Sequence, residues 1–573
     1  METIFERYLK RNELKIQQHQ LKGVEWGLKN KTTGNEVVYG GGGGGETAAT
    51  APKSKSKSKI IYGGIIADEM GLGKTYQMLG IIISKIHTEL PTLIVLPLAL
   101  INQWRTAIRT TLGHEPLVYH GAQKKKTTLA ILNAQRLVIT TYGLISSAAM
   151  KKPAGGGGAN LLHECTWAEI VFDEAHYLRN KSQVKAGALK LKTSCRWLIT
   201  GTPIQNRQAD LNSLFAILGV PEELYKKKPI KDILPLIHAF MLRRTKAEIK
   251  MDLPPLVITE IPVKWANKKE TEIAIRIHET LSFSFSRNKA VFEMPILTRL
   301  VRARQVCVYP ALVKVKKNTA IGGGDNDNND NNEAEADDDA DFTQYLEKHE
   351  KALAGSSKIN AVIAHLVARA EDKKCKLVFC HYRGELDILA ARLHRETPAL
   401  VIKTLDGRTN QKERSVILNK ETPCDILLLQ IQTGCVGLNL QQYNQVYFVS
   451  PHWNPAVEDQ AIARCYRMGQ LNPTEVFRFS MVGFAEAAAA KAAAKAEAAA
   501  EEAEAEAEEE EEAEAEAEEE EEEEEEEAEE EEEEEEEEAE EEEEKNSIDQ
   551  YAMLVQEKKR KVMVELEAEK LTN

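Results

Sequence analysis

The eight residues Asp68–Thr75 have the types and order of a loop that binds phosphate. Their sequence, Asp-Glu-Met-Gly-Leu-Gly-Lys-Thr, follows an apolar run at 60–67 and precedes a helix-like run at 76–87. A phosphate-binding loop needs this place between a strand and a helix, because its backbone N–H groups must face the phosphates at the helix start. We therefore predict a nucleotide site here; the alternative is an ordinary strand–helix turn.

Individual residues of this segment can be given chemical roles. Gly71 and Gly73 allow the tight turn of the backbone, and Lys74 can neutralise the β- and γ-phosphates of a nucleotide. The hydroxyl of Thr75 is placed to bind Mg²⁺. The general pattern has glycine where this chain has Asp68, so the motif is not complete. The predicted nucleotide-binding residues of the loop are Asp68, Glu69, Met70, Gly71, Leu72, Gly73, Lys74 and Thr75.

Two adjacent carboxylates follow the apolar run 169–172. Asp173 is placed to hold Mg²⁺, directly or through water, and Glu174 is placed to orient and polarise the attacking water of a hydrolysis reaction. A solvated acidic turn is the alternative for such a pair. The phosphate-binding segment lies about 100 residues upstream, and this combination favours the catalytic interpretation.

Gln460, Arg464 and Arg467 are spaced i, i+4 and i+7, which places them on one face of a helix. Two guanidinium groups and an amide suit a polyphosphate, because arginine can donate two parallel hydrogen bonds to its oxygens. An exposed basic face is the alternative. This half of the chain has no phosphate-binding loop of its own, so we predict that these residues reach across to the first. The predicted catalytic residues are Lys74, Asp173, Glu174, Gln460, Arg464 and Arg467.

The elements that must position these residues recur in two blocks of the chain. Each block has short apolar runs rich in Ile, Val and Leu, separated by helix-like or polar stretches. Such runs indicate parallel strands that helices cover on both faces, so we predict an α/β fold with two lobes. The expected strands are 60–67, 92–97, 136–141, 169–172 and 196–200, then 376–380, 400–405, 425–430, 445–449 and 475–481. The polar motifs follow strand ends, where ligands bind in such sheets.

The formal net charge of −17 combines two very acidic segments with a basic remainder. Residues 485–544 contain 38 Glu and 2 Lys, and the chain without them carries +19. Residues 325–341 hold nine more carboxylates and no Lys or Arg, and without both segments the net charge is near +28. A balance of this size predicts a partner rich in phosphate, such as nucleic acid.

The glutamate segment 485–544 has two interpretations. It is either a solvated loop or a competitor of DNA for the basic surface, which could also bind basic proteins such as histones. The basic run Lys558–Lys561 can serve as a nuclear signal, which predicts a nucleus or a viral replication compartment inside a host cell.

Other features of composition narrow the class of protein. No run approaches the roughly 18 apolar residues of a membrane span, so no membrane partner is expected. The charged start of the chain predicts no signal peptide. The eight cysteines form no C-x-x-C pair, which predicts neither a zinc site nor a disulfide framework.

These motifs resemble, in order and spacing, the Swi/Snf family of helicase-related, DNA-translocating ATPases. The resemblance covers nearly all of the chain outside the low-complexity segments. It runs through 14–26, 68–75, 93–104, 138–145, 173–176, 198–206, 242–245, 376–382, 405–408, 434–440, 453–455 and 460–470. Several of these motifs are weak individually, but together they are specific.

The resemblance implies two RecA-like lobes around ATP and Mg²⁺, with helical protrusions and a C-terminal brace helix. It implies translocation along double-stranded DNA, driven by ATP hydrolysis, and remodelling of chromatin, nucleosomes or other protein–DNA complexes. Gln20 matches the position that reads adenine. The residues that match coupling segments are His176, Thr200, Gly201, Thr202, Gln205 and Gly437. The residues that match DNA-facing motifs are Pro97, Trp104, Thr140, Thr141, Tyr142 and Trp453.

The same resemblance suggests how the chain is divided. The predicted segments are an ATP-binding lobe at 1–240 with a flexible loop at 40–59, a helical protrusion and linker at 241–320, an acidic linker at 321–357, and a helicase lobe at 358–573 that holds the acidic insert 485–544 and the brace helix 545–570. No zinc-binding RING module is visible. The bare core and the phrase 431–438 resemble small viral members such as the baculovirus global transactivators.

Two other functions remain open at this level. A catalytically silent DNA-binding regulator is one, although the intact Lys74, Asp173 and Glu174 argue against it. A strand-separating DNA or RNA helicase is the other, although the phrases 453–455 and 468–470 argue for a double-strand translocase.

Overall fold

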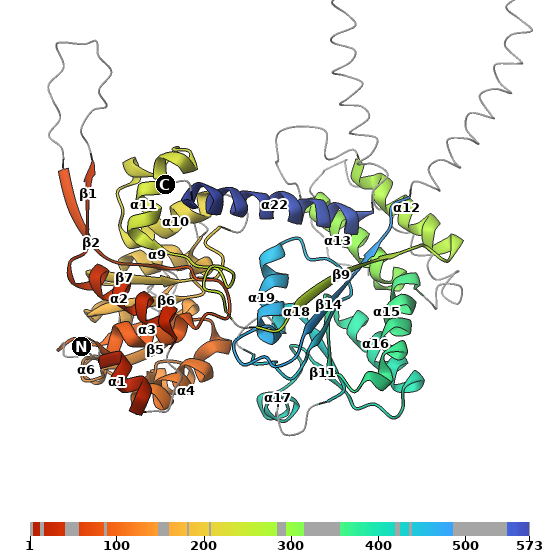
Figure 1. Ribbon diagram of the computed structural model, residues 1–573, viewed down its shortest axis with the longest axis horizontal. Coiled ribbons are helices and arrows are strands. Elements are labelled where there is room, and N and C mark those ends of the chain that lie inside the picture. The colour runs from red at the N-terminus through yellow and green to blue at the C-terminus, as the bar shows by residue number, and fades with distance from the viewer. Residues whose placement is uncertain are drawn as a thin grey trace, which may run out of the picture.

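The computed structural model shows two α/β lobes side by side, with a long helix, α22, running across both (Figure 1). It describes residues 4–11, 17–39, 57–84, 89–146, 160–179, 183–204, 208–251, 253–282, 294–313, 356–418, 424–434, 438–484 and 547–571. The acidic segments 325–341 and 485–544 and the coupling candidates Gln205 and Gly437 lie outside the described residues.

The first lobe is built on an eight-stranded sheet in the order β1-β2-β7-β6-β3-β5-β4, with β8 paired to β2. All pairs are parallel except β1–β2. The strands are β1 Asn35–Tyr39, β2 Lys57–Ile66, β3 Thr92–Leu96, β4 Leu117–Val118, β5 Leu137–Thr141, β6 Glu169–Asp173, β7 Cys195–Ile199 and β8 Met241–Leu242. The helices are α1 Ile4–Arg11, α2 Gln18–Thr32, α3 Lys74–Ile83, α4 Ile101–Leu112, α5 Gly121–Lys126, α6 Leu129–Asn133, α7 Tyr142–Ile145, α8 Leu161–Glu164, α9 Gln183–Lys190, α10 Ala209–Leu218 and α11 Ile230–Phe240.

Strand β6 shows why the central strands are continuously apolar. Every residue of β6 is buried, and successive side chains enter different hydrophobic clusters. Ile170 and Phe172 pack into one cluster, and Val171 packs into another on the opposite face. Since successive side chains point to opposite faces of a sheet, helices on both faces require an apolar residue at every position.

The second lobe has a six-stranded, all-parallel sheet in the order β11-β12-β10-β13-β14-β9. Its strands are β9 Leu256–Val263, β10 Lys376–Cys380, β11 Ile402–Leu405, β12 Ile426–Gln430, β13 Gln445–Phe448 and β14 Thr474–Met481. Its helices are α12 Lys268–Ser282, α13 Met294–Val308, α15 Ser357–Ala368, α16 Arg383–Glu396, α17 Gln411–Ile417, α18 Ile431–Gly434 and α19 Pro455–Cys465.

The predicted α/β class and all ten predicted strands are confirmed, with ends that differ by up to three residues. Four strands, β1, β4, β8 and β9, were not predicted. β4 and β8 have two residues each, too few for a pattern, and most of β9 is exposed. The range 241–320, expected as a helical protrusion and linker, contributes the helices α12 and α13 but also β8 to the first sheet and β9 to the second.

Helix α22, Ile548–Leu571, contacts β14, α13 and α19 of the second lobe and α11 of the first. Its start is held in the second lobe, because the buried Asp549 carboxylate accepts hydrogen bonds from the Lys358 ammonium group and from Met481 N–H. Figure 1 shows its far end beside α10 and α11. The helix therefore bridges both lobes.

Candidate functional site

The segment Asp68–Thr75 leaves β2 and turns into α3 as the sequence predicted. Gly71 and Gly73 have φ values of 94° and 77°, which only glycine adopts readily, and Gly73 is the N-cap of α3. The Lys74 ammonium donates to the Asp68 carbonyl at 2.8 Å and the Glu69 carbonyl at 3.3 Å. Burial lowers the pKa of Lys74, against the opposing charges of Glu174, Asp68 and Asp173. The loop thus places the Lys74 ammonium group at the N-terminus of α3, and helix N-termini bind anions.

The Asp68 side chain does not face the phosphate position. Its carboxylate is fully buried and accepts two hydrogen bonds from the Arg244 guanidinium, at 3.0 and 2.5 Å, and one from Gln77 at 2.9 Å. Only its backbone carbonyl meets Lys74. Because Arg244 bonds to both carboxylate oxygens, the side chain of Asp68 holds the loop in place, and its role in nucleotide binding stays a prediction.

Glu69 joins the loop to the second lobe. It accepts the Lys246 N–H at 2.7 Å and forms an ion pair with the Lys246 ammonium at 3.1 Å. That ammonium also donates to the Tyr466 carbonyl at 3.4 Å and lies 4.8 Å from the centre of the Tyr466 ring. A methyl group placed on Gly71 would come 3.4 Å from the Arg467 Cβ, so the two lobes are in contact at this loop.

Gln20 lies against the same loop. The side chain is buried and donates to the Leu72 carbonyl at 3.3 Å, and the ring of His19 approaches the same oxygen at 3.1 Å. A Cβ on Gly73 would overlap the Gln20 amide at 2.3 Å, so glycine is required there for space as well as for its φ. A Cβ on Gly201, in the loop after β7, would lie 2.5 Å from the Met70 side chain.

Asp173 is the last residue of β6, Glu174 follows it, and the charges of both act on Lys74 of the loop. Glu174 has a φ of 52°, an uncommon value for a residue with a side chain, and it turns the chain into the 3₁₀ turn Ala175–Leu178. The Trp104 indole donates to Asp173 Oδ2 at 2.6 Å, and the Glu174 N–H donates to Oδ1 at 3.0 Å. The Tyr142 hydroxyl donates to the Asp173 carbonyl at 2.7 Å.

The two carboxyl groups have opposite electrostatic environments. Burial, together with the neighbouring charge of Glu174, raises the pKa of Asp173 to about 6. Burial also acts to raise the pKa of Glu174, but the His176 ring and the charges of Arg464 and Lys74 outweigh it and lower that pKa to about 2. These surroundings therefore favour the ionised form of Glu174 over that of Asp173.

The helix α19 brings the second lobe to these carboxylates. The Gln460 amide donates to Glu174 Oε1 at 3.1 Å, and the charge of Arg464 acts on the same carboxylate. The helix ends at Cys465, so Arg467 is not on the predicted helical face but in the following turn. Burial and the nearby Arg464 lower the pKa of Arg467. Residues 286 positions apart in the sequence, one from each lobe, therefore meet directly.

Three of the described coupling candidates, Thr200, Gly201 and Thr202, lie in the loop after β7, and His176 lies in the turn after β6. The Thr200 hydroxyl accepts the Thr202 N–H at 3.2 Å and donates to the Thr202 carbonyl, which closes a tight turn. Arg243 donates to the Gly201 carbonyl at 3.4 Å. His176 Nδ1 lies 3.2 Å from Glu174 Oε2. The loop and the carboxylates thus share one edge of the first sheet.

Most of the predicted DNA-facing side chains are buried. The five buried side chains are Pro97, Trp104, Thr140, Thr141 and Tyr142. Trp104 and Tyr142 bond to Asp173 instead, and the Thr140 hydroxyl donates to the Tyr119 carbonyl. These side chains are packed inside the first lobe in this conformation, and their place in motifs that face DNA stays a prediction.

Trp453 is the predicted DNA-facing residue that is partly exposed. The guanidinium of Arg304 lies 5.6 Å from its ring centre, and Tyr551 of α22 packs edge-on against it at 5.8 Å. The Lys559 ammonium donates to its carbonyl at 3.0 Å. Two cations from separate helices therefore contact Trp453, Arg304 at its ring and Lys559 at its backbone carbonyl.

The oxygen donors of the cleft fit Mg²⁺. The ion prefers hard oxygen ligands and usually binds through one or two protein groups plus phosphate oxygens and water. Thr75 supplies a hydroxyl and Asp173 a carboxylate, and each Asp173 oxygen accepts one hydrogen bond and so keeps a lone pair. Lys74 lies within the electrostatic reach of both carboxylates. These groups would hold the ion between the loop and β6.

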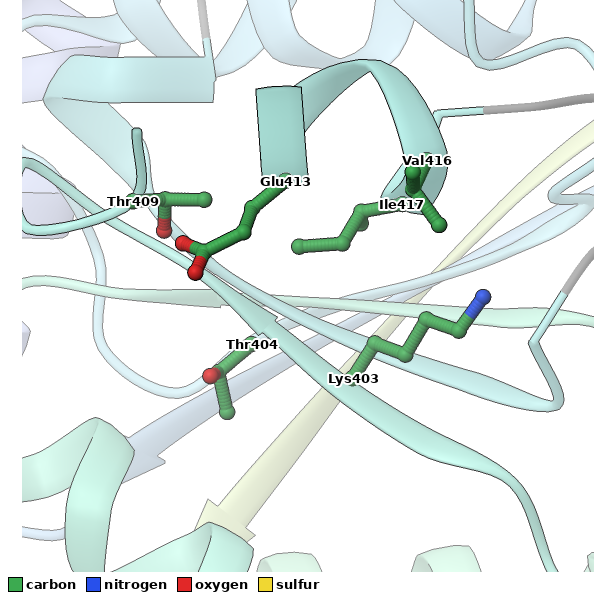
Figure 2. Close-up of a pocket in the computed structure, with 6 residues that line it drawn as sticks. All are labelled: Lys403, Thr404, Thr409, Glu413, Val416 and Ile417. Carbon is green, nitrogen blue, oxygen red and sulfur yellow. The ribbon is translucent and has the colours of Figure 1, made fainter. Parts of the chain in front are cut away.

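A separate hollow lies at the outer edge of the second sheet. It is lined by Lys403, Thr404, Thr409, Glu413, Val416 and Ile417. Figure 2 shows these side chains between β11 and α17, and none of them belongs to the predicted site. In the described part of the chain no helix is long and apolar enough to cross a bilayer, and no three His, Cys, Asp or Glu side chains gather as metal ligands.

Sequence reasoning missed four residues that complete the site: Gln77, Arg244, Lys246 and Arg304. Arg244 lies in the range 242–245 of the family resemblance, but no role was predicted for it. A signal for it exists, because Arg243–Arg244 follows the strand β8, which ends beside β2 and hence beside the phosphate-binding loop. Nothing local marks Gln77 or Lys246, whose partners are set by tertiary contact.

Comparisons with known proteins identify the family of the chain. The model of the SNF2-related domain matches residues 19–312, and the model of the helicase conserved C-terminal domain matches 357–469. The chain therefore belongs to the SNF2-related, helicase-like ATPase family, a family that uses ATP. The predicted resemblance is confirmed.

Two relatives indicate the range of the family. The chain is 28% identical to the "probable global transactivator" of Orgyia pseudotsugata multicapsid polyhedrosis virus, over 80% of this chain and 85% of the viral protein. It is 26% identical to the DNA repair protein RAD5B of Arabidopsis thaliana, over 73% of this chain but 43% of that protein. The chain thus spans most of the viral relative and less than half of the plant one.

Among solved structures, the chain is similar to the Sulfolobus solfataricus SWI2/SNF2 ATPase core in complex with dsDNA. The identity is 22%, and the match covers 82% of this chain and 88% of that one with a TM-score of 0.34.

Proposed function

We propose that this protein is a DNA-dependent ATPase that translocates on double-stranded DNA and hydrolyses ATP between its two lobes. The observation that carries the proposal is the 3.1 Å hydrogen bond from Gln460 to Glu174, which brings the second lobe to the carboxylate suited to activate water. A cleft that closes on this contact can link the state of the nucleotide to the relative position of the lobes.

Each residue of the cleft has a task in this proposal. Lys74 offsets the charge of the β- and γ-phosphates, and Mg²⁺, held by Thr75 and Asp173, supplies further neutralisation when bound. Glu174, ionised because its pKa is near 2, accepts a hydrogen bond from the attacking water. Arg464 and Arg467 stabilise the charge that develops on the transferred phosphoryl group, an effect worth roughly 10³- to 10⁵-fold in rate.

Duplex DNA is the proposed track. The basic balance outside the acidic segments, near +28, favours a polyanion. The Sulfolobus ATPase core was solved in complex with dsDNA, and the names of the relatives include a DNA repair protein and a transactivator. We extend the proposal to the remodelling of chromatin, nucleosomes or other protein–DNA complexes, in the nucleus or a viral replication compartment.

Steady-state ATP hydrolysis tests the proposal. The protein is assayed without nucleic acid and with duplex DNA, single-stranded DNA or RNA, beside Lys74→Ala and, as a control, Lys231→Ala, an exposed lysine of α11. We expect stimulation chiefly by duplex, its loss in Lys74→Ala, and wild-type behaviour in Lys231→Ala. Turnover that duplex DNA does not raise, or that survives in Lys74→Ala, would contradict the proposal. Displacement of a triplex-forming strand then measures movement along the duplex.

A further inference from the structure

Asp173 is held by two aromatic side chains that sequence reasoning assigned to DNA. The Trp104 indole N–H donates to its Oδ2 at 2.6 Å, and the Tyr142 hydroxyl donates to its backbone carbonyl at 2.7 Å. The third donor, the Glu174 N–H, reaches Oδ1 at 3.0 Å. Side chain and main chain of Asp173 are therefore fixed by separate bonds.

Both aromatic donors are rigid. Trp104, on α4, is fully buried in the cluster that covers one face of the first sheet, and Tyr142, at the start of α7, is 5% exposed. An indole offers a single N–H donor, so its direction is set by the packing of its ring. Tyr142 is also stacked on Tyr177, with ring centres 5.1 Å apart. These rings leave the Asp173 carboxylate little freedom to rotate.

The other buried tryptophans show that this contact differs from ordinary packing. The Trp167 indole donates to the Leu162 carbonyl at 2.9 Å, a neutral structural bond. The Trp197 indole donates to the Glu169 carboxylate at 3.0 Å, but that carboxylate already has a cation, because Lys31 pairs with it at 2.8 Å.

Asp173 has no such cation. Among the described residues, no lysine or arginine lies within 4.0 Å of its carboxylate oxygens, so its bonded partners are neutral N–H donors. A buried carboxylate without an ion pair is costly unless a cation joins it. We propose that Trp104 and Tyr142 are positioning residues that hold Asp173 in the orientation that binds Mg²⁺, an inference that rests on the proposed ATP-dependent function.

The test measures nucleotide binding, not turnover. Fluorescence of N-methylanthraniloyl-ATP is followed during a Mg²⁺ titration and, separately, in excess EDTA, with no nucleic acid present. We compare wild type, Trp104→Phe, which removes the N–H and keeps an aromatic ring, and Trp167→Phe, which makes the same change at the structural tryptophan.

Loss of a group that orients a metal ligand typically costs 10- to 100-fold in metal affinity. We expect Trp104→Phe to raise the Mg²⁺ concentration for half-maximal binding by about 10-fold and to leave binding in EDTA unchanged. Trp167→Phe should leave both unchanged. An equal Mg²⁺ requirement in the two variants, or an equal loss in EDTA, overturns the proposal.

Tyr142→Phe keeps the stack on Tyr177 and removes only the hydroxyl, so it decides the question if Trp104→Phe does not fold. We expect a smaller rise in the Mg²⁺ requirement, about threefold, because its bond reaches the backbone and is neutral. No rise overturns the role of Tyr142. This test measures nucleotide binding without DNA, so its result does not depend on whether duplex DNA stimulates ATP hydrolysis.

Discussion

Asp173 of the first lobe and Asp549 at the start of α22 are both buried carboxylates, yet their partners differ in kind. Asp173 accepts hydrogen bonds from an indole and a backbone N–H, whereas Asp549 meets the ammonium group of Lys358 directly. Asp549 has its cation built into the chain, and Lys358 is itself fully buried and bonded to the Ser450 hydroxyl at 2.9 Å.

The partners of a buried carboxylate therefore distinguish a group that can bind a ligand from a group that holds the fold together. A carboxylate held by neutral donors can still bind a cation reversibly, as we propose for Asp173 and Mg²⁺. The charge of a carboxylate paired with lysine is already neutralised by that lysine. The Lys358–Asp549 pair instead holds together two segments that lie 191 residues apart in the sequence. Variants of the two regions should therefore fail in different ways, one in turnover and the other in stability.

Glu174→Gln should give the largest effect and should act on turnover alone. Removing the ionised carboxylate should lower ATP hydrolysis by about 10³-fold, the usual contribution of a general base. The amide oxygen can still accept the bond from Gln460, so the melting temperature should stay near that of wild type. Parallel measurements of hydrolysis, nucleotide binding and thermal unfolding check this, and a large loss of stability would contradict the comparison.

Lys358→Met should act on stability. It leaves the Asp549 charge buried and unpaired, which costs about 3–5 kcal/mol. We expect faster hydrogen exchange at the start of α22 and a lower melting temperature. The double variant Lys358→Met/Asp549→Asn removes both charges and keeps an acceptor for Met481 N–H, so it should recover part of the loss. No recovery would show that the pair does not act as a unit.

Glu385→Gln should change how stability depends on pH. Burial raises the pKa of Glu385 to about 7, from 4.5, although its Oε2 accepts the His381 and Tyr382 N–H groups. Between these values the unfolded chain releases a proton that the folded chain keeps, so wild-type stability falls as pH rises towards 7.

Glutamine has no proton to lose, so the melting temperature of Glu385→Gln relative to wild type should rise between about pH 4.5 and pH 7 and then level off. The full difference corresponds to about 3 kcal/mol. Thermal unfolding of both proteins in a pH series measures it. A difference that is constant with pH would mean that Glu385 has the same pKa in the folded and unfolded chains.

Gln460→Ala should give the smallest effect and should sharpen the comparison between the lobes. It removes one hydrogen bond to a charged acceptor, worth about 1.5 kcal/mol, so turnover should fall roughly 10-fold with stability unchanged. Arg392→Ala, which removes a hydrogen bond to Asn360 within the second lobe, is the matched control and should keep full turnover.

The sequence alone predicted the class of fold, and its motifs named several residues that the structure brings together. Continuous apolar runs marked all ten predicted strands, because strands covered on both faces need an apolar residue at every position. Lys74, Glu174 and Gln460 were named from local motifs, since glycine-rich turns, strand ends and helical spacing are local properties. Arg467 was placed on the wrong element because no local signal marks the end of α19.

Tertiary structure decided which groups each of these residues meets. The Trp104–Asp173 bond joins residues 69 positions apart, and the Arg244–Asp68 pair joins residues 176 apart. Such contacts depend on strand order and helix packing, which no local pattern encodes. For this reason the sequence named Asp173 as a magnesium ligand, whereas only the folded chain shows that its orientation depends on two buried aromatic rings.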